Sequence, residues 1–137
     1  MPSTRTDLHL LDANVLIALT VAEHEHHRRV ARWIAGTERI ALCPVVEGAL
    51  VRFLVRIGET AATAQEVLRL HHQDPRCELW PDTISYADVA LGHVRGHRQV
   101  TDAYLASLAA SRGARLATLD TTLARELPSQ TFLVPAS

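Results

Sequence analysis

The sequence reads LHLLDANVLIAL at residues 8–19, and this stretch decides the fold. Leu8 to Leu11 form a short apolar run that ends at Asp12, which predicts a buried strand. Asn14 is placed to cap a helix over Val15 to Val21. The stretch therefore predicts a strand, a turn and a helix, the first unit of a sheet that is covered by helices.

The rest of the chain repeats this alternation. A second strand-length apolar run, Ala114 to Leu119, also ends at an aspartate, Asp120. An alanine-rich helix over Val100 to Ser111 precedes it and ends at Gly113. Further strands are predicted at 40–43, 77–80 and 132–134, and further helices at 26–34, 44–57 and 122–127, with a short helix opening at Ser85. Another helix runs to about His72, and it begins either at the capping-box spacing of Thr63 and Glu66 or already near Glu59.

This order of elements predicts the fold class. Strands that alternate with helices favour a parallel sheet covered on both faces. We expect an α/β fold, a three-layer α/β/α sandwich with a mainly parallel sheet of about five strands. The length of 137 residues fits one domain, residues 1–137.

The composition excludes several classes of protein. Hydrophobic residues make up 47% of the chain, enough for one core, and the formal net charge of −1 means that any nucleic-acid contact must be local. All 14 basic residues are arginine, which excludes Schiff-base chemistry and the lysine of a P-loop. Cys43 and Cys77 lack C-x-x-C spacing, and we expect buried thiols. No signal pattern or membrane-length apolar run is found, so we expect a cytoplasmic protein without a membrane partner.

Four acidic residues fall where the predicted elements meet. Asp12 and Asp120 each follow a predicted strand, and the carboxyl ends of parallel strands form the ligand-binding edge of such a sheet. Glu47 and Asp102 lie near the starts of two predicted helices and can point toward the same edge. Because converging carboxylates repel one another, the pattern predicts a hard divalent cation, Mg²⁺ or Mn²⁺. Such an ion activates water and stabilises the leaving oxygen of a phosphodiester, which favours phosphoryl chemistry.

Each acid taken alone also fits a helix cap. An aspartate after a strand is a common N-cap, worth about 1 kcal/mol, and Glu47 in a first turn suits the helix dipole. Asp12 is the strongest functional candidate, because apolar residues flank it on both sides and a lone carboxylate there is costly.

Four motifs carry a resemblance to a known family. LLDANVLIAL at 10–19, PVVEGAL at 44–50, VTDAYLASLA at 100–109 and ATLD at 117–120 resemble PIN domains in order and spacing. The resemblance covers essentially the whole chain. The length is similar to that of the VapC-type ribonuclease toxins of bacterial type II toxin–antitoxin modules.

The resemblance implies a site, a substrate and partners. The substrate would be RNA, such as tRNA or rRNA, and the chain would be a homodimer inhibited by a small cognate VapB-like antitoxin. Either Glu47 or Asp120 would orient or deprotonate the attacking water. The implied catalytic and metal-binding residues are Asp12, Glu47, Asp102 and Asp120, with Asp12 and Asp102 as direct magnesium ligands and Asn14 and Thr118 as supporting polar residues.

Arginines at the rim of the acidic site would have to hold the RNA. Any one of them also fits a solvated surface or an ion pair. Apolar residues on the helices between Val45 and Leu70 are candidates for a partner or dimer surface. The arginine candidates are Arg52, Arg56, Arg95, Arg98 and Arg112.

The histidines support no zinc site. His93 and His97 have the i, i+4 spacing of a helical metal pair, but glycines weaken that helix and the glutamate of H-E-x-x-H is missing. His24, His26 and His27 form a segment similar to one that recurs in VapC-like chains between the first two helices. Packing, solvation and a place at the substrate rim all fit it.

Two other classes of function stay open. A phosphatase that acts through phosphoaspartate usually has D-x-D near its first strand, whereas this chain has Asp12-Ala13-Asn14. A non-enzymatic binding module, in which the acids only cap helices, predicts that they can be neutralised without loss of function.

Overall fold

The computed structural model describes residues 7–136 and contains a five-stranded sheet. Every pair of neighbouring strands is parallel, and the spatial order is β3-β2-β1-β4-β5. This confirms the predicted α/β class and the predicted number of strands. The strands are β1 (Leu8–Leu11), β2 (Arg39–Leu42), β3 (Cys77–Leu79), β4 (Arg115–Thr118) and β5 (Thr131–Leu133).

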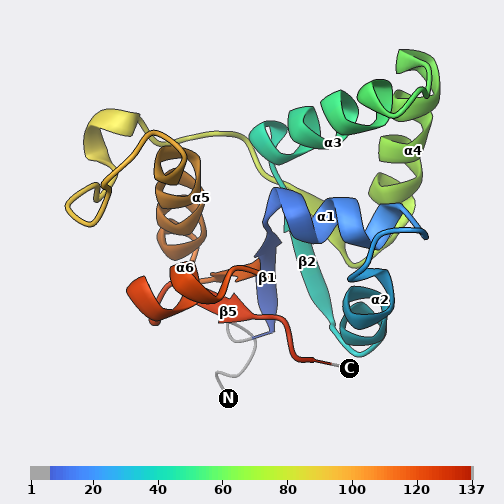
Figure 1. The fold of residues 1–137 in the computed structure, drawn as a ribbon. Helices are drawn as coiled ribbons and strands as arrows, with labels where there is room; N and C mark the ends of the chain where they lie inside the picture. Colours follow the sequence, from blue (N-terminus) through green and yellow to red (C-terminus); the bar gives the residue numbers. More distant parts are fainter. Residues whose placement is uncertain (1–6, 137) are drawn as a thin grey trace.

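Helices flank the sheet on both sides (Figure 1). From β1 the chain moves outward through β2 to β3, and it then returns to the other side of β1 for β4 and β5. Because parallel crossovers are right-handed, this reversal puts the helices of the two halves on opposite faces. The helices of the first half are α1 (Ala13–Thr20), α2 (His27–Ala35), α3 (Pro44–Arg56) and α4 (Ala61–Gln73), and those of the second are α5 (Gln99–Ser111) and α6 (Thr121–Glu126).

The core lies around the central strand β1. Its four residues are all buried, because β2 and β4 pair with it on either side and helices cover both of its faces. In α5, Ala103, Ala106 and Ala109 are buried, and their small side chains let the helix approach the sheet closely. Burial of the side chain of a leucine such as Leu10, which is fully buried, stabilises the folded state by about 1.5–3 kcal/mol relative to an exposed side chain.

One predicted helix start is wrong. Asp12, not Asn14, caps α1, because Asp12 has extended backbone angles and its side chain accepts a hydrogen bond from the backbone N–H of Ala13. At α4, whose start the sequence left open, Thr60 is the cap and accepts from the N–H of Thr63. Asn14 is therefore free to point away from the helix axis into solvent.

Both cysteines are free thiols, as predicted. Cys43 is buried and Cys77 is half-buried. Burial raises the pKa of each thiol to about 11, which keeps it protonated and unreactive at neutral pH. None of the helices in residues 7–136 has the length and apolar content that crossing a membrane requires.

Candidate active site

The candidate site lies where β1 and β4 run side by side. These two strands flank the point at which the strand order reverses, and open α/β sheets bind ligands at the carboxyl ends of such strands. The backbone N–H of Asp12, just after β1, donates to the carbonyl of Ala117 in β4 at 3.0 Å. Residues about a hundred positions apart in sequence are thus brought together at one edge of the sheet.

Asp12 is buried at this edge, with 6% of its surface exposed. Its Oδ1 accepts from the N–H of Ala13 at 2.7 Å, and its Oδ2 accepts from the hydroxyl of Thr118 at 3.1 Å. Burial raises the pKa of the Asp12 carboxyl, and the charge of Asp120 adds to this, while the two hydrogen bonds act in the opposite direction. The carboxyl group therefore caps a helix, and it has no ion pair with a basic side chain of residues 7–136.

Thr118 joins Asp12 to Asp120. Its hydroxyl is fully buried, donates to Asp12 and accepts from the backbone N–H of Asp120 at 3.0 Å. Asp120 in turn caps α6, since its Oδ1 accepts from the N–H groups of Thr122 and Leu123 at 2.9 and 3.1 Å. Within residues 7–136, the other carboxylate oxygen of Asp120 makes no hydrogen bond, so it is available to a ligand.

The Thr118 hydroxyl supplies a testable contribution to stability. We expect Thr118→Val, which keeps the shape but removes the hydroxyl, to lower the free energy of unfolding by about 1–3 kcal/mol, because Asp12 loses a donor and the N–H of Asp120 loses an acceptor. Thr118→Ser keeps both bonds and serves as the control. Denaturant unfolding of the two variants checks this, and equal losses in both would attribute the effect to packing.

Asp102 is the third acid of the cluster. It lies in the first turn of α5, where Arg98 is the capping residue, so Asp102 does not cap the helix. Its pKa is raised to about 7, first by burial and then by the charges of Asp12 and Asp120. Three aspartates from three segments therefore form one electrostatic cluster, and none of them has an ion pair with an arginine or histidine of residues 7–136.

Glu47 points toward another partner. It lies in the first turn of α3, with 15% of its side chain exposed, and its Oε2 is 2.5 Å from Nε2 of His72 on α4. The structure does not join it to the three aspartates by a hydrogen bond, and its membership of the catalytic set remains a prediction. Sequence reasoning did not find His72, because no local pattern indicates which residue of α3 will face the last turn of α4.

The three aspartates fit a hard divalent cation in their chemistry. Carboxylate oxygens are the ligands that Mg²⁺ and Mn²⁺ prefer, and a cation would relieve the repulsion that raises the Asp102 pKa. In residues 7–136, no group of three or more acidic, histidine or cysteine side chains is placed so that it could hold a metal ion. Mg²⁺ does not require such a group, because it keeps several waters and binds through one or two carboxylates together with substrate phosphates.

The polar residues that the sequence singled out lie at different distances from this cluster. Asn14 lines a hollow together with Leu119 and Asp120. Arg95 and Arg98 lie just before α5 and so near the end that carries Asp102. Arg112 follows the other end of α5, about 15 Å along the helix axis from Asp102, and its guanidinium lies over Trp80. The structure therefore does not bring Arg112 to the aspartates.

Comparison with known proteins shows the family of this chain. A family model described as PIN domain matches residues 9–126, and the chain belongs to this family. Over 129 residues it is 51% identical to Ribonuclease VapC29 of Mycobacterium tuberculosis, which covers 93% of this chain and 97% of that protein. The resemblance that the four motifs indicated is confirmed.

Solved structures agree on the fold. The chain is similar to the crystal structure of Mycobacterium tuberculosis VapC20, described as a sarcin–ricin loop cleaving toxin, with a TM-score of 0.70 and 18% identity over 95% of this chain and 99% of that one. It is also similar to a chain of VapBC2 from Rickettsia felis bound to a promoter DNA fragment, with a TM-score of 0.64 and 18% identity over 92% and 96% of the two chains.

Proposed function

We propose that this protein is a metal-dependent endoribonuclease that hydrolyses RNA phosphodiester bonds as the toxin of a type II toxin–antitoxin pair. The observation that carries the proposal is the cluster of Asp12, Asp102 and Asp120 at the switch point of the sheet, whose charges no basic group in residues 7–136 neutralises. The kinship with VapC ribonucleases supports the same conclusion.

The cluster argues against a module in which acids only cap helices. Asp12 and Asp120 do cap α1 and α6, so that interpretation is correct as far as it goes. Asp102 caps nothing, and its position close to two other carboxylates raises its pKa to about 7, which is unfavourable for the charged form. A carboxylate kept at such a cost is typical of a functional site.

The proposed chemistry assigns a role to each acid. A bound Mg²⁺ or Mn²⁺ supplies an activated water and stabilises the charge that develops on the leaving oxygen. Asp12 and Asp102 are the proposed direct ligands. Asp120 orients the attacking water through the carboxylate oxygen that its cap leaves unused. Glu47 is the fourth proposed member of this set, and its Oε2 is hydrogen-bonded to His72.

The proposed substrate is a structured RNA, tRNA or rRNA. Because the net charge of the chain is −1, arginines near the acidic edge have to offset the repulsion between RNA and the aspartates. Arg52 and Arg56 on α3 line a hollow that also contains Asn14, and Arg95 and Arg98 precede α5. A ribonuclease of this kind works in the cytoplasm, which is the location that we propose.

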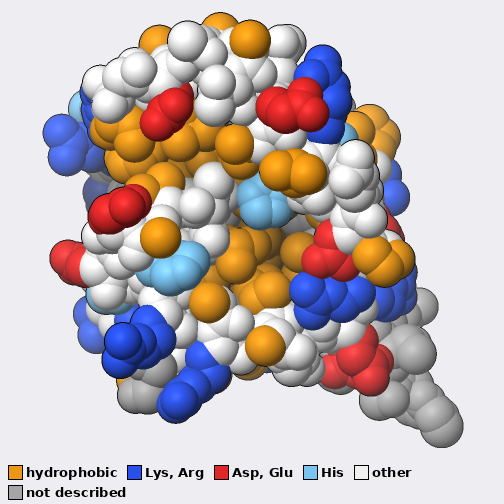
Figure 2. All heavy atoms as spheres, turned by 90° about the vertical axis from the view of Figure 1, so that its right-hand side faces the viewer, with side chains coloured by type: hydrophobic (Ala, Val, Ile, Leu, Met, Phe, Trp, Pro, Cys, Tyr) orange, Lys and Arg blue, Asp and Glu red, His pale blue; other side chains and the backbone are white. Residues whose placement is uncertain are grey.

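The proposed macromolecular partners are a small cognate VapB-like antitoxin and a second copy of the chain. The face that α4 and α2 present carries a band of hydrophobic side chains in its upper half, where α3 and α4 lie (Figure 2). Val55 and Ile57 at the end of α3 and Leu70 of α4 are exposed, and Leu54, Ile57 and Val67 line a hollow of about 340 Å³. An exposed apolar surface of this kind supports binding of a partner chain.

Metal removal tests the proposed function. We expect the purified protein to cleave total RNA at defined positions with Mg²⁺ or Mn²⁺ and to lose this activity when the metals are chelated by EDTA, because no basic group of the described chain replaces the cation beside the aspartates. Mapping of the RNA ends measures both the activity and the cleavage position. Cleavage at an unchanged rate in EDTA would contradict the metal role, and restored cleavage on adding Mg²⁺ is the control.

A further inference from the structure

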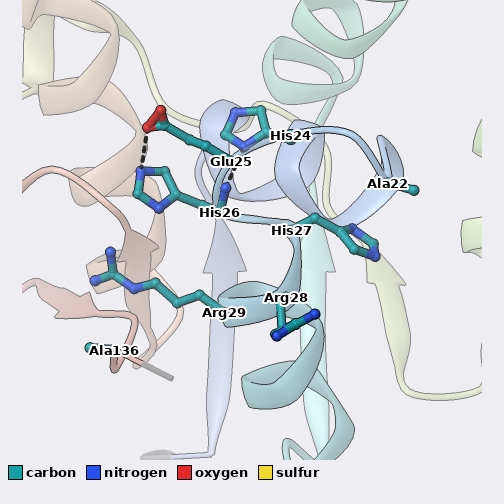
Figure 3. A pocket seen from close by; sticks show the side chains of 8 residues that line it. All are labelled: Ala22, His24, Glu25, His26, His27, Arg28, Arg29 and Ala136. Atoms are coloured by element: carbon teal, nitrogen blue, oxygen red, sulfur yellow. Dashed lines mark hydrogen bonds and ion pairs between the residues drawn. The ribbon is translucent and has the colours of Figure 1, made fainter.

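The loop between α1 and α2, residues 21–26, lies beside the acidic cluster and is fixed from both ends. Nδ1 of His27 donates to the carbonyl of Ala18 at 2.8 Å, which ties the start of α2 to the end of α1. The guanidinium of Arg29 donates to the carbonyls of Val134 and Pro135. In Figure 3, Arg29 extends toward Ala136, while His24, Glu25 and His26 gather on the other side of the loop. His27 and Arg29 therefore have structural roles.

His24 has a hydrogen-bonding state that the loop itself sets. The backbone N–H of His26 donates to its Nδ1 at 3.0 Å, so that nitrogen carries a lone pair (Figure 3). A neutral imidazole with an acceptor at Nδ1 must carry its proton at Nε2. Within residues 7–136, Nε2 of His24 makes no hydrogen bond. The loop thus presents one N–H donor without a partner.

His24 lines three hollows of the surface. The first, of about 400 Å³, is also lined by Asn14 and by Asp120 of the acidic edge. The second, of about 420 Å³, is lined by Asn14, Arg52 and Arg56. The third, of about 600 Å³, is lined by His26 and Arg28. We refer to these three hollows together, which have His24 in common, as the depression beside the acidic edge.

The two arginines of α3 are held on this depression by local packing. A Cβ on Gly48 would lie 3.4 Å from Nη1 of Arg52, so the guanidinium of Arg52 folds back over the glycine toward the start of α3. The guanidinium of Arg56 lies over the ring of Phe53, 5.7 Å from its centroid. Neither arginine has an ion pair with a carboxylate of residues 7–136, so both retain their charge for a ligand.

The two acids on the loop, Glu23 and Glu25, do not remove this property. Glu23 is exposed to solvent and lines none of the three hollows. Oε2 of Glu25 lies 3.3 Å from Nε2 of His26, and 77% of the Glu25 side chain is exposed to solvent. Its charge is therefore partly screened and directed at His26 instead of His24.

We propose that His24 is a substrate-positioning residue, which donates its Nε2–H to a phosphate of the RNA next to the scissile one, while Arg52 and Arg56 bind phosphates further along the same strand. The proposal rests on the ribonuclease function proposed above and names the path that the RNA takes to the acidic cluster. A polyanion fits this depression because its donors, one imidazole and two guanidiniums, have no partner within the described chain.

Two substitutions of His24 separate positioning of RNA from support of the loop. In His24→Asn, the side-chain oxygen takes the place of Nδ1 and keeps the bond from the N–H of His26, but the outer donor is lost. In His24→Gln, the side-chain nitrogen takes the place of Nε2 and keeps the outer donor, but the bond within the loop is lost. The matched control is Arg69→Gln on α4, whose guanidinium is paired with Glu66 and lies outside the three hollows.

The measurement is the dissociation constant of a short fluorescein-labelled single-stranded RNA of mixed sequence, by fluorescence anisotropy at several salt concentrations. Asp102→Asn protein is used throughout so that the RNA stays intact. We expect His24→Asn to weaken binding about tenfold with little change in salt dependence, because a neutral donor to a charged acceptor is lost. We expect His24→Gln to stay within about threefold of the parent, and Arg52→Gln to weaken binding and lower the salt slope by about 0.7.

The outcomes distinguish this proposal from the proposed function. If the protein with Asp102 intact cleaves RNA with Mg²⁺ but His24→Asn binds RNA as well as the parent, the positioning role is refuted and the ribonuclease function stands. If His24→Gln loses binding and His24→Asn keeps it, the ring only supports the loop, and the positioning role is again refuted. If the Asp102→Asn parent does not bind RNA and the protein with Asp102 intact does not cleave it, both proposals fall.

Discussion

Asp102→Asn will reduce the rate of RNA cleavage at least about a hundredfold while leaving the protein folded. Asparagine has nearly the shape of aspartate, and Asp102 makes no hydrogen bond within residues 7–136 that the amide would break. What changes is the charge: one of the two proposed direct metal ligands becomes a neutral and much weaker donor. Single-turnover cleavage of RNA with saturating Mg²⁺ measures the loss.

Asp88→Asn is the matched control for this experiment. Asp88 is an exposed aspartate in a short 3-10 helix, Tyr86–Asp88, and its charge is not among those that raise the pKa of Asp12 or Asp102. The substitution makes the same chemical change there. We expect its cleavage rate to equal that of the unsubstituted protein. Circular dichroism of both variants verifies that they are folded. An Asp102→Asn protein that cleaves RNA at the full rate would remove Asp102 from the catalytic set.

Asp102→Asn will also stabilise the metal-free protein, by an amount that depends on the pH. The folded pKa of Asp102, about 7, lies above the ordinary value of 3.8, so the folded state binds a proton that the unfolded state has released. The free energy of unfolding therefore falls as the pH rises from about 4 to about 7, because Asp102 loses its proton in the folded state. In Asp102→Asn the free energy of unfolding does not fall for this reason. Above pH 7 we expect the variant to be more stable by on the order of 2 kcal/mol, after allowance for partial solvent screening.

The difference between the two proteins is the quantity to measure. Burial lowers the pKa values of His9 and His71, so the stability of both proteins also falls as the pH drops below about 6.5, and this common effect cancels in the difference. Denaturant unfolding in EDTA at a series of pH values gives the curve. A difference that does not change with pH would show that Asp102 is not in a repulsive cluster. Saturating Mg²⁺ should remove the advantage of the variant, because only the unsubstituted site gains from the cation.

The part of the site that could be predicted follows from the topology of a parallel sheet. Asp12 and Asp120 each end a short apolar run, and carboxyl ends of parallel strands always share one edge. Their meeting therefore needed only the prediction that both runs are strands in one sheet. The role of Thr118 came from the family resemblance, and its two hydrogen bonds explain why a hydroxyl is useful at the end of β4.

Contacts between surface helices could not be predicted in this way. Glu47 pairs with His72 because α3 and α4 pack at one particular rotation, and the sequence pattern of either helix fixes only its buried stripe. The cap of α1 was predicted at Asn14 instead of Asp12 for a related reason: two cap-forming side chains stand close together, and the backbone angles decide between them. The sequence did not distinguish Arg112 from the other candidate arginines, but Arg112 follows the end of α5 that lies away from Asp102.

The pairing of β1 with β4 also bears on how the chain is made. Asp12 leaves the exit tunnel of the ribosome early in translation, whereas Asp120 emerges only after most of the polypeptide. Contacts between residues so distant in sequence form slowly, because the long segment between them must be ordered before they can form. Until Asp120 has been synthesised and lies beside Asp12, the chain lacks the complete set of acids that the proposed function requires.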